Sequence, residues 1–415
     1  MTSPVNRRTL LSNAGLALAG LGMGACAPKT RAQMPPAMPT PGMPVPGVAR
    51  RPMVSLAPVR VSRDRVIRAT VGLRPHRPSG FVLKAAKLDQ KTIIHNFGHG
   101  GSGMSLSWGT ATMAADMALE QPERRAAVLG SGVVGLTTAR QLQRRGFAVT
   151  IYAANVPPDV TSNWSLAAWT PTSGLVDVSK RTPEWSAQLV QAAEIAYRQL
   201  QFMASPRYGI SWISNYTPTE SAESARGENA LLPKHLLSEM TVLQPGEHPF
   251  PTRYAIERPE LRIEPNIYLP ALMDDVLAFG GQIVVRKFET PRDVMALSEN
   301  LVVNCTGLGA KALFGDAELM PLRGLLVLLP PQDEVNYSTG GGVNIPEAQR
   351  GLFIHMMPRH DGIVLGGTSE RDLWTTEVNE AEKVRIIDNH VNLFASMTPP
   401  MGRGPMAAPA PRGRQ

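Results

Sequence analysis

The stretch RRAAVLGSGVVGLTTARQLQRRGFAVTIYA, residues 124–153, decides the fold of this chain. Residues 126–129 are apolar and predict a short buried strand. Small and apolar residues then recur at steps of four and three over residues 135–146, which predicts one packed face of a helix, and residues 148–152 supply a second strand. Strand, glycine-rich turn, helix and strand together predict a Rossmann-like unit of the α/β class.

Three glycines in this stretch have the G-x-G-x-x-G spacing of a dinucleotide-binding turn. Gly130 makes the tight turn, Gly132 lets the backbone approach a pyrophosphate, and Gly135 lets helix and strand pack closely. The pyrophosphate would then rest on the positive N-terminus of the helix, so Val133 and Val134 join the expected cofactor contacts.

The end of the second strand lacks an expected residue. An acidic side chain usually binds the ribose hydroxyls about 20 residues after the glycines. This chain has Ala153, Ala154 and Asn155 there. Asn155 can form a hydrogen bond but carries no charge, so we expect a different or weaker ribose contact, and this strand alone does not distinguish NAD from FAD.

The composition suits one large domain or two medium ones, with 415 residues of which 43% are hydrophobic. The formal charge of +8 comes from the ends: residues 1–51 hold six basic and no acidic side chains, and residues 396–415 hold three more basic ones. The body is therefore near −1, which gives no support for nucleic-acid binding. Cys26 and Cys305 are too few for a disulfide framework or a metal cluster, and we expect no metal.

The N-terminal segment has the features of an export signal. Arg7 and Arg8 precede a short apolar, glycine-rich run that ends in small residues and Cys26. The run is too short for a comfortable membrane span and is similar to a twin-arginine signal, which exports folded proteins. Cys26 also fits a lipoprotein-like site. We expect residues 1–27 to be a signal, residues 28–58 a proline-rich linker and residues 396–415 a disordered tail. The signal predicts an exported protein, either periplasmic or anchored by a lipid facing the periplasm.

Four further stretches resemble the D-amino-acid oxidase family of FAD-dependent enzymes. They are GLRPHRPSGFVL with the later TIIHNFGHGGSGMSLSWGTATMAADMAL, then VTSNWSLAAWTPTSGLVD, RKFETPRDVMALSENLVVNCTGLGAKALFGD and RGLFIHMMPRHDGIVLGGTSE. Together these matches cover most of residues 65–395. The resemblance implies a Rossmann-like FAD-binding domain and a mixed-sheet α+β substrate domain, with FAD as the cofactor.

The order of these stretches differs from the family, because the segment that should close the chain precedes the nucleotide motif. A circular permutation explains this order, with the old termini joined through residues 118–128, and a fusion of two unrelated fragments is the alternative. Within the permuted chain, residues 185–203 have the helical period of a helix that packs on the substrate domain. The expected segments are residues 59–80 (substrate-domain strand), 81–170 (FAD-binding), 171–270 (substrate domain), 271–320 (FAD-binding) and 321–395 (substrate domain and lid).

The resemblance also implies an activity. A D-amino acid would lose its α-hydrogen as a hydride to the flavin, oxygen would reoxidise the flavin, and the products would be a 2-oxo acid, ammonia and hydrogen peroxide. Two alternatives remain open: oxidation of glycine or an N-methyl amino acid, and an exported flavin-fold protein that binds its ligand without turnover.

Three residues carry the expected substrate contacts. By resemblance, Arg77 matches the arginine that binds the substrate carboxylate, while Arg74 is expected to be structural. Gly101 matches the residue whose carbonyl accepts a hydrogen bond from the substrate amine. His355 stands where the family's mammalian members have a tyrosine, and an imidazole that can be charged would favour an acidic side chain.

The remaining expectations concern the cofactor and the histidines of the first glycine loop. His95 and His99 are expected to orient that loop rather than bind a metal, and Cys305 to be a small buried residue. The residues expected to contact FAD, wrap its ring or line the route to it are Gly100, Ser102, Gly103, Met104, Ser105, Thr161, Ser162, Trp169, Thr170, Thr306 and Gly307.

Overall fold

The computed structural model describes residues 51–166, 168–223, 231–341 and 354–398. The predicted signal over residues 1–27, with Cys26, and residues 399–415 of the predicted tail lie outside the described residues. Met397, which the prediction placed in the disordered tail over residues 396–415, is buried in the core instead. Within the described part, none of the helices combines the length and the apolar character that crossing a bilayer requires.

A six-stranded sheet contains the predicted nucleotide-binding unit. Its neighbouring strands are parallel except for an antiparallel pair at one edge. The predicted strand–helix–strand unit is confirmed: β4 leads into α2 and then β5. In order across the sheet, the strands are β2 (Val82–Leu88), β3 (Lys91–Phe97), β10 (Leu301–Asn304), β4 (Arg125–Leu129), β5 (Ala148–Ala153) and β9 (Gln282–Val285).

Four longer helices pack beside this sheet, and their packing corrects one expectation. The helix over residues 185–203 was expected on the substrate domain, but α3 packs against α1. Its buried residues include Leu189 and Ala193, which join the same core as α1 and α2. The close approach needs Gly109 of α1, because a Cβ there would lie 1.9 Å from the carbonyl oxygen of Ala192. The helices are α1 (Gly103–Leu119), α2 (Val133–Gln143), α3 (Pro183–Phe202), α4 (Pro265–Ala278) and the short α5 (Pro291–Met295) and α6 (Ala310–Phe314).

A nine-stranded sheet forms the second part of the fold. Its described pairs are antiparallel except β12 with β6, so it is a mixed sheet, as expected. Helix α7 (Glu380–Ala395) packs on β11 and β14. In order, the strands are β1 (Arg68–His76), β11 (Met320–Leu329), β14 (Gly362–Gly366), β13 (His355–Arg359), β12 (Tyr337–Thr339), β6 (Ile210–Thr219), β8 (Tyr254–Ile263) and β7 (Thr241–Leu243), and β15 (Glu370–Arg371) pairs with β11.

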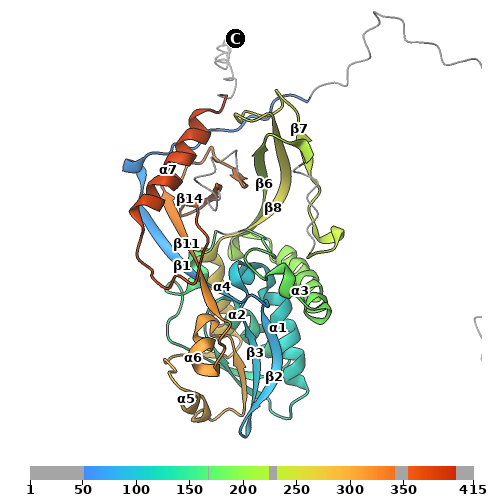
Figure 1. Cartoon of the computed structure of the whole chain (residues 1–415). Coiled ribbons are helices and arrows are strands. Elements are labelled where there is room, and N and C mark those ends of the chain that lie inside the picture. The colour runs from blue at the N-terminus through green and yellow to red at the C-terminus, as the bar shows by residue number, and fades with distance from the viewer. Residues whose placement is uncertain (1–50, 167, 224–230, 342–353, 399–415) are drawn as a thin grey trace, which may run out of the picture. The chain divides into compact units, whose positions relative to one another are not determined.

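Strands that are far apart in sequence lie side by side in both sheets. The blue β1 pairs along its whole length with the orange β11 (Figure 1). In the six-stranded sheet, β3 from the first hundred residues pairs in parallel with β10. The chain then leaves α1 and enters β4 after residues 120–124. β1 and β3, which precede β4 in the chain, therefore pair with strands that come much later in the chain.

The expected linker extends too far into the packed chain. Residues 28–58 were expected to be an extended spacer, and residues 28–50 of it lie outside the described residues. Leu56, within this expected spacer, and Val59, just after it, are buried in the core beneath the nine-stranded sheet. The backbone N–H of Val54 donates to the carbonyl of Glu247 at 3.0 Å. The burial of these apolar side chains packs the end of the proline-rich run against the sheet, so residues 51–58 belong to the packed part of the chain.

Candidate active site

One cavity of about 660 Å³ draws its walls from both sheets. The G-x-G-x-x-G turn, the loop before α1 and residues 152–165 form one part of the wall. Residues of β1, β8, β11 and β13 form another part. A cavity of this size, with polar groups from several elements, is typical of a site for a small molecule or cofactor.

The dinucleotide turn has the geometry that its glycines require. Gly130 has a φ of 104°, and a Cβ there would lie 2.6 Å from the carbonyl oxygen of Cys305. A Cβ on Gly135 would lie 1.9 Å from the Gly130 carbonyl oxygen. Gly132, Val133 and Val134 line the cavity, whereas Gly135 faces the strand. Gly135 therefore acts on packing, and the turn presents backbone N–H groups of the α2 N-terminus to the cavity.

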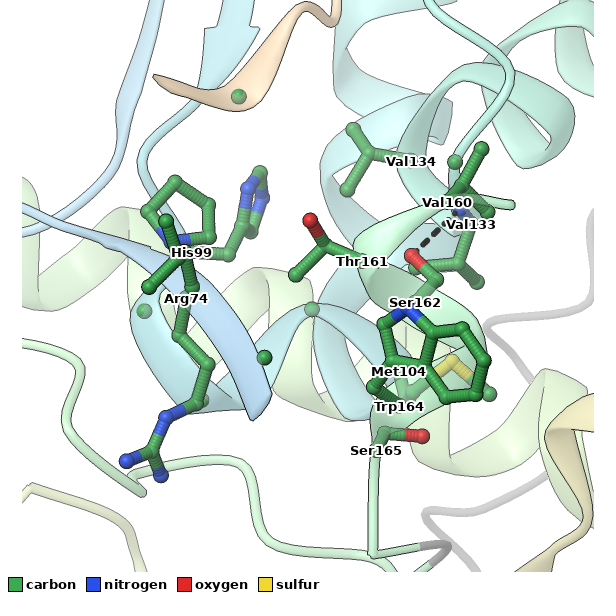
Figure 2. Close-up of a pocket in the computed structure, with 18 of the residues that line it drawn as sticks. Arg74, His99, Met104, Val133, Val134, Val160, Thr161, Ser162, Trp164 and Ser165 are labelled. Atoms are coloured by element: carbon green, nitrogen blue, oxygen red, sulfur yellow. Dashed lines mark hydrogen bonds between the residues drawn. The ribbon is translucent and has the colours of Figure 1, made fainter. Parts of the chain in front are cut away.

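Two hydroxyls stand beside this helix N-terminus. Figure 2 shows Thr161 and Ser162 next to Val133, with the hydrogen bond from the Val133 N–H to Ser162 Oγ, 3.1 Å long, as a dashed line. Both hydroxyl residues line the cavity. Backbone N–H groups, a helix dipole and hydroxyl donors together favour an anion such as a pyrophosphate.

The second glycine loop is fastened to residues 173 and 174. The Gly101 N–H donates to the Ser173 carbonyl at 2.9 Å, and a Cβ on Gly100 would lie 1.9 Å from the Gly174 carbonyl oxygen. Gly98, Gly100, Gly101, Gly103 and Met104 line the cavity at the start of α1.

Ser102 and Ser105 do not line the cavity, contrary to the expectation that they contact the cofactor. Ser102 Oγ donates to the Ser173 carbonyl at 3.1 Å, and Ser105 Oγ accepts from the Thr170 N–H at 2.8 Å. Both hydroxyls face the neighbouring loop because helix α1 turns them away from the cavity. They hold the loop in place instead.

His99 lines the cavity within this loop, and its side chain is almost fully buried. Its ring stacks on Phe81 with centroids 5.4 Å apart, and its Nε2 lies 3.1 Å from Thr110 Oγ1. Burial lowers the pKa of His99 to about 3. His99 is therefore a neutral imidazole that positions the loop.

His95 positions another part of the wall. Asn304 Nδ2 donates to His95 Nδ1 at 3.1 Å, and Asn304 Oδ1 accepts from the Thr306 hydroxyl at 2.7 Å. Burial, followed by the charge of Lys84, lowers the pKa of His95 to about 4. Across the described residues, no group of histidine, cysteine and acidic side chains is arranged to hold a metal ion.

The segment around Cys305 reaches the cavity, as expected for Thr306 and Gly307, which both line it. Cys305 is buried, with Sγ 3.6 Å from Thr138 Oγ1, and burial raises its pKa to about 12. A thiol with this pKa stays protonated at neutral pH and serves as a small buried residue.

Trp169 lies elsewhere than expected, whereas Thr170 lines the cavity. The Trp169 ring packs on Tyr197 with centroids 4.9 Å apart, and the backbone N–H of Trp169 donates to the Leu261 carbonyl at 2.8 Å. The segment crosses β8 at this point, which turns Trp169 toward α3. Trp164 lines the cavity in its place, and sequence reasoning missed it.

The predicted role of Arg77 is wrong. Its guanidinium donates to Asp316 at 2.9 Å, to Glu318 at 2.6 Å and to the Gly80 carbonyl at 2.8 Å. Arg77 is absent from the cavity wall. The residue stands one position past β1, on the opposite alternation from Arg74, so its side chain points to these two carboxylates.

Arg74 occupies the place expected for Arg77. It lines the cavity, and its guanidinium donates to the carbonyl oxygens of Leu322 (2.9 Å), Arg323 (3.2 Å) and Thr368 (3.2 Å). Among the described residues, none supplies a carboxylate in an ion pair with it. Burial lowers the pKa of Arg74 to about 10, so it remains a cation at neutral pH. A desolvated cation without an anion favours an anionic ligand.

His355 lines the cavity, where it was expected, but not with the expected charge. Burial, and then the charges of His390, Arg258 and Arg74, lower its pKa to about 4. The ring is therefore neutral near pH 7, and the preference for an acidic side chain that depended on its charge loses its basis.

At the end of β5, Asn155 lines the cavity, and its carbonyl accepts from Ser131 Oγ at 2.6 Å. Asp159 and Arg286 also line this part of the wall. Sequence reasoning missed both, because Asp159 follows a turn and Arg286 comes directly after β9, far away in the chain.

Three more polar residues of the wall escaped the sequence analysis: Asn215 of β6 and Arg258 and Glu260 of β8. The alternation of polar residues in YAIERPELRI offered a signal, since positions two apart share a face of a strand. The sequence did not reveal which face meets the cavity.

Taken together, these features define a dinucleotide-binding oxidoreductase site. Two helix N-termini and two hydroxyls open onto one cavity with a buried cation, and the crowded glycines leave no room for a Cβ. These donors suit the pyrophosphate of a flavin cofactor and the negative charge that its ring carries when reduced.

Comparison with known proteins identifies the family. The sequence model of the FAD dependent oxidoreductase family matches residues 125–405, more than half of the chain, so the protein belongs to this family. Its cofactor is FAD.

The curated relatives that it matches are distant. D-amino-acid oxidase of Rubrobacter xylanophilus is 28% identical over 263 residues, covering 63% of this chain and 75% of that protein. D-amino-acid oxidase of Streptomyces coelicolor is 28% identical, covering 60% and 71%. D-aspartate oxidase of Talaromyces thermophilus is 25% identical, covering 65% and 77%.

Solved structures with a similar fold include glycine oxidase from Geobacillus kaustophilus, with a TM-score of 0.48 and 14% identity over 66% of this chain and 80% of that one. Glycine oxidase from Bacillus cereus gives a TM-score of 0.46 and 13% identity, covering 65% and 78%.

The neutral His99 makes stability depend on pH. Its folded pKa of about 3 lies below the ordinary value of 6.5, so between these values the unfolded chain binds a proton that the folded chain does not. Stability therefore falls as the pH falls through this window. Between pH 7 and pH 5 we expect a loss of about 2 kcal/mol from this residue.

The measurement is urea unfolding of the FAD-loaded protein at both pH values. His99→Gln should lose about 2 kcal/mol less than the wild type, whereas His235→Gln, at an exposed histidine, should follow the wild type. Equal losses in the wild type and His99→Gln would contradict the neutral core role.

Proposed function

We propose that this protein oxidises D-amino acids to 2-oxo acids, ammonia and hydrogen peroxide, with FAD as the acceptor of the α-hydrogen. The observation that carries the proposal is Arg74, a partly buried cation with no described carboxylate partner, in the same cavity as the dinucleotide turn. The curated relatives named above, two D-amino-acid oxidases and a D-aspartate oxidase, support the same substrate class.

Arg74 would bind the substrate carboxylate. The carbonyl oxygens of Leu322, Arg323 and Thr368 hold its guanidinium in one orientation, so little side-chain entropy is lost when the carboxylate binds. The interaction also gains strength from the low dielectric of a buried site. A fixed carboxylate leaves the α-carbon in a defined position.

The loop before α1 would contact the amine of the substrate and the flavin ring. Gly101 lines the cavity, and its carbonyl is our candidate acceptor for the substrate amine. The N-terminus of α1 stabilises negative charge nearby through its dipole. Bound here, FAD would supply the acceptor for the α-hydrogen and its electron pair, oxygen would take these electrons from the cofactor, and hydrolysis of the imino acid would give the 2-oxo acid and ammonia.

The two arginines give a matched pair of variants. Arg74→Met should keep the yellow colour of bound FAD but weaken the apparent affinity for D-alanine about 100-fold, because a charge-assisted contact is lost. Arg77→Met should keep that affinity but melt at a lower temperature, since Asp316 and Glu318 lose their partner.

The readouts are bleaching of the flavin band on anaerobic mixing with D-alanine, and thermal unfolding. L-alanine, glycine and N-methylglycine serve as comparison substrates. Affinity lost in Arg77→Met and kept in Arg74→Met would contradict the assignment, and a yellow protein that no amino acid bleaches would contradict the activity.

We further propose that the chain is a circularly permuted member of the family. Its support is that β3 precedes β4 in the chain but pairs in parallel with β10 in the same sheet, that α1 packs against α2, and that the family match begins at residue 125. The two ends of the packed chain also lie against one short segment. The Thr398 N–H donates to the Pro249 carbonyl at 2.8 Å, and the Val54 N–H donates to the Glu247 carbonyl at 3.0 Å.

A reordered chain tests this. Residues 125–398, a short Gly/Ser linker and then residues 51–119 should fold and bind FAD within about threefold of the wild-type affinity, because the cut falls between α1 and β4. A second reordered chain, cut inside α2, should fail. Loss of FAD binding in the first chain would contradict the permutation.

Export is a separate proposal, because residues 1–27 lie outside the described part. Arg7 and Arg8 would direct the folded protein across the membrane, and Cys26 would carry a lipid. Residues 1–58 fused to a reporter active only outside the cytoplasm should give signal, and Arg7→Lys with Arg8→Lys should abolish it. Cys26→Ala should move the exported reporter from the membrane to the soluble fraction. Undiminished signal in the double variant would contradict the twin-arginine role.

A further inference from the structure

Two opposite charges on β8 face the cavity beyond Arg74. Arg258 and Glu260 are two positions apart, so they share a face of the strand, and both line the cavity. Glu257 lies on the other face, where it accepts a hydrogen bond from the Tyr216 hydroxyl at 2.8 Å. This part of the cavity therefore carries two charged groups, with which an apolar substrate side chain could form no ion pair.

Glu260 is held in place by neighbouring strands. Its Oε2 accepts from the Ser338 hydroxyl at 2.8 Å and from Asn215 Nδ2 at 3.3 Å. Asn215 also donates to Ser338 at 2.9 Å, and both of these side chains are buried. No described residue donates to Oε1. A carboxylate with one oxygen fixed and the other available is prepared to accept a further hydrogen bond.

The position of Glu260 suits the side chain of a substrate rather than its α-amine. The nine-stranded sheet runs in the order β1, β11, β14, β13, β12, β6, β8, so His355 on β13 lies between Arg74 on β1 and Glu260 on β8. Along the sheet, Glu260 therefore lies farther than His355 from the carboxylate anchor. An α-amine is one carbon from the carboxylate and stays near Arg74, so the group that reaches Glu260 is at the far end of the side chain.

Of the two charges on β8, Glu260 has the stronger effect on a ligand. Arg258 is exposed, and water and salt screen its charge. Glu260 is only partly exposed, and this burial raises the pKa of its carboxyl. Shielded charges interact more strongly with a ligand.

We propose that Glu260 binds the cationic end of a basic D-amino-acid side chain, an ammonium or a guanidinium, so that the preferred substrates are of the D-lysine and D-arginine class. This inference rests on the proposed function, because it assumes that the α-carboxylate binds at Arg74. Asn215 and Ser338 position the carboxylate, and Arg258 opposes the cation from its exposed position.

The test uses ligands that cannot react, so that it is independent of turnover. ε-Aminohexanoate carries a carboxylate and a distal ammonium, and hexanoate lacks the ammonium. Titration calorimetry of the FAD-loaded full chain should show ε-aminohexanoate binding about tenfold more tightly than hexanoate. Shorter ω-amino acids, each with its matched alkanoate, cover other distances.

Variants assign the preference to Glu260. Glu260→Gln keeps an oxygen for Ser338 and Asn215, and should reduce the ratio of the two affinities to about one. Glu257→Gln, on the opposite face of β8, should leave the ratio as in the wild type. Arg258→Gln, at an exposed position, should raise the ratio because it removes a repulsive charge, and this gives a second test should Glu260→Gln fold poorly.

Three results would overturn the proposal: no preference for the amine in any matched pair, an unchanged ratio in Glu260→Gln, or tighter binding of a dicarboxylate such as adipate than of ε-aminohexanoate, which would assign the site to Arg258. A protein that shows the preference but never bleaches with any amino acid would contradict the proposed oxidation while leaving the binding site intact.

Discussion

The site depends on a cation held out of water. Arg74 donates to the carbonyl oxygens of Leu322, Arg323 and Thr368, which carry only partial charges, so its full charge stays uncompensated by any described side chain. Such a group costs free energy in the folded state unless an anion binds. The strands around it show what this requires: Gly324 stands where a Cβ would lie 3.0 Å from Arg74 Nη2. The absence of a side chain at Gly324 leaves space for the guanidinium, and the three carbonyl oxygens hold it in place.

The cavity joins this cation to the dinucleotide turn through a shared set of loops. Residues 173 and 174 brace the glycine loop before α1, and the Thr170 N–H binds Ser105 at the start of that helix. His99, which lines the cavity, and His95 stay neutral and fix Thr110 and Asn304 in their positions. Because these contacts come from the interior, the loops that line the cavity are supported by core packing rather than by one another alone.

The strand–turn–helix–strand unit was predictable because its determinants are local. The glycine spacing and the apolar periods act over fewer than thirty residues, and β4, α2 and β5 fall where they were expected. The expected contacts of Thr161, Ser162, Thr306 and Gly307 also line the cavity. Wrong expectations arose where contacts come from distant segments. α3 packs on α1 rather than on the second sheet, Trp169 turns to Tyr197, and residues 51–58 pack instead of extending.

The sequence alone determined that this chain binds a dinucleotide cofactor, since a turn with no room for a Cβ can be read from its glycines. It also contained the pair Arg74 and Arg77, but not the choice between them. That choice was made by β11 and the segment before it, which place backbone carbonyls beside one arginine and the carboxylates of Asp316 and Glu318 beside the other. The partners of both arginines lie more than two hundred residues away in the chain. Only the folded sheet brings the carbonyl oxygens to Arg74, on one face of β1, and the two carboxylates to Arg77, which points the other way just past the end of β1.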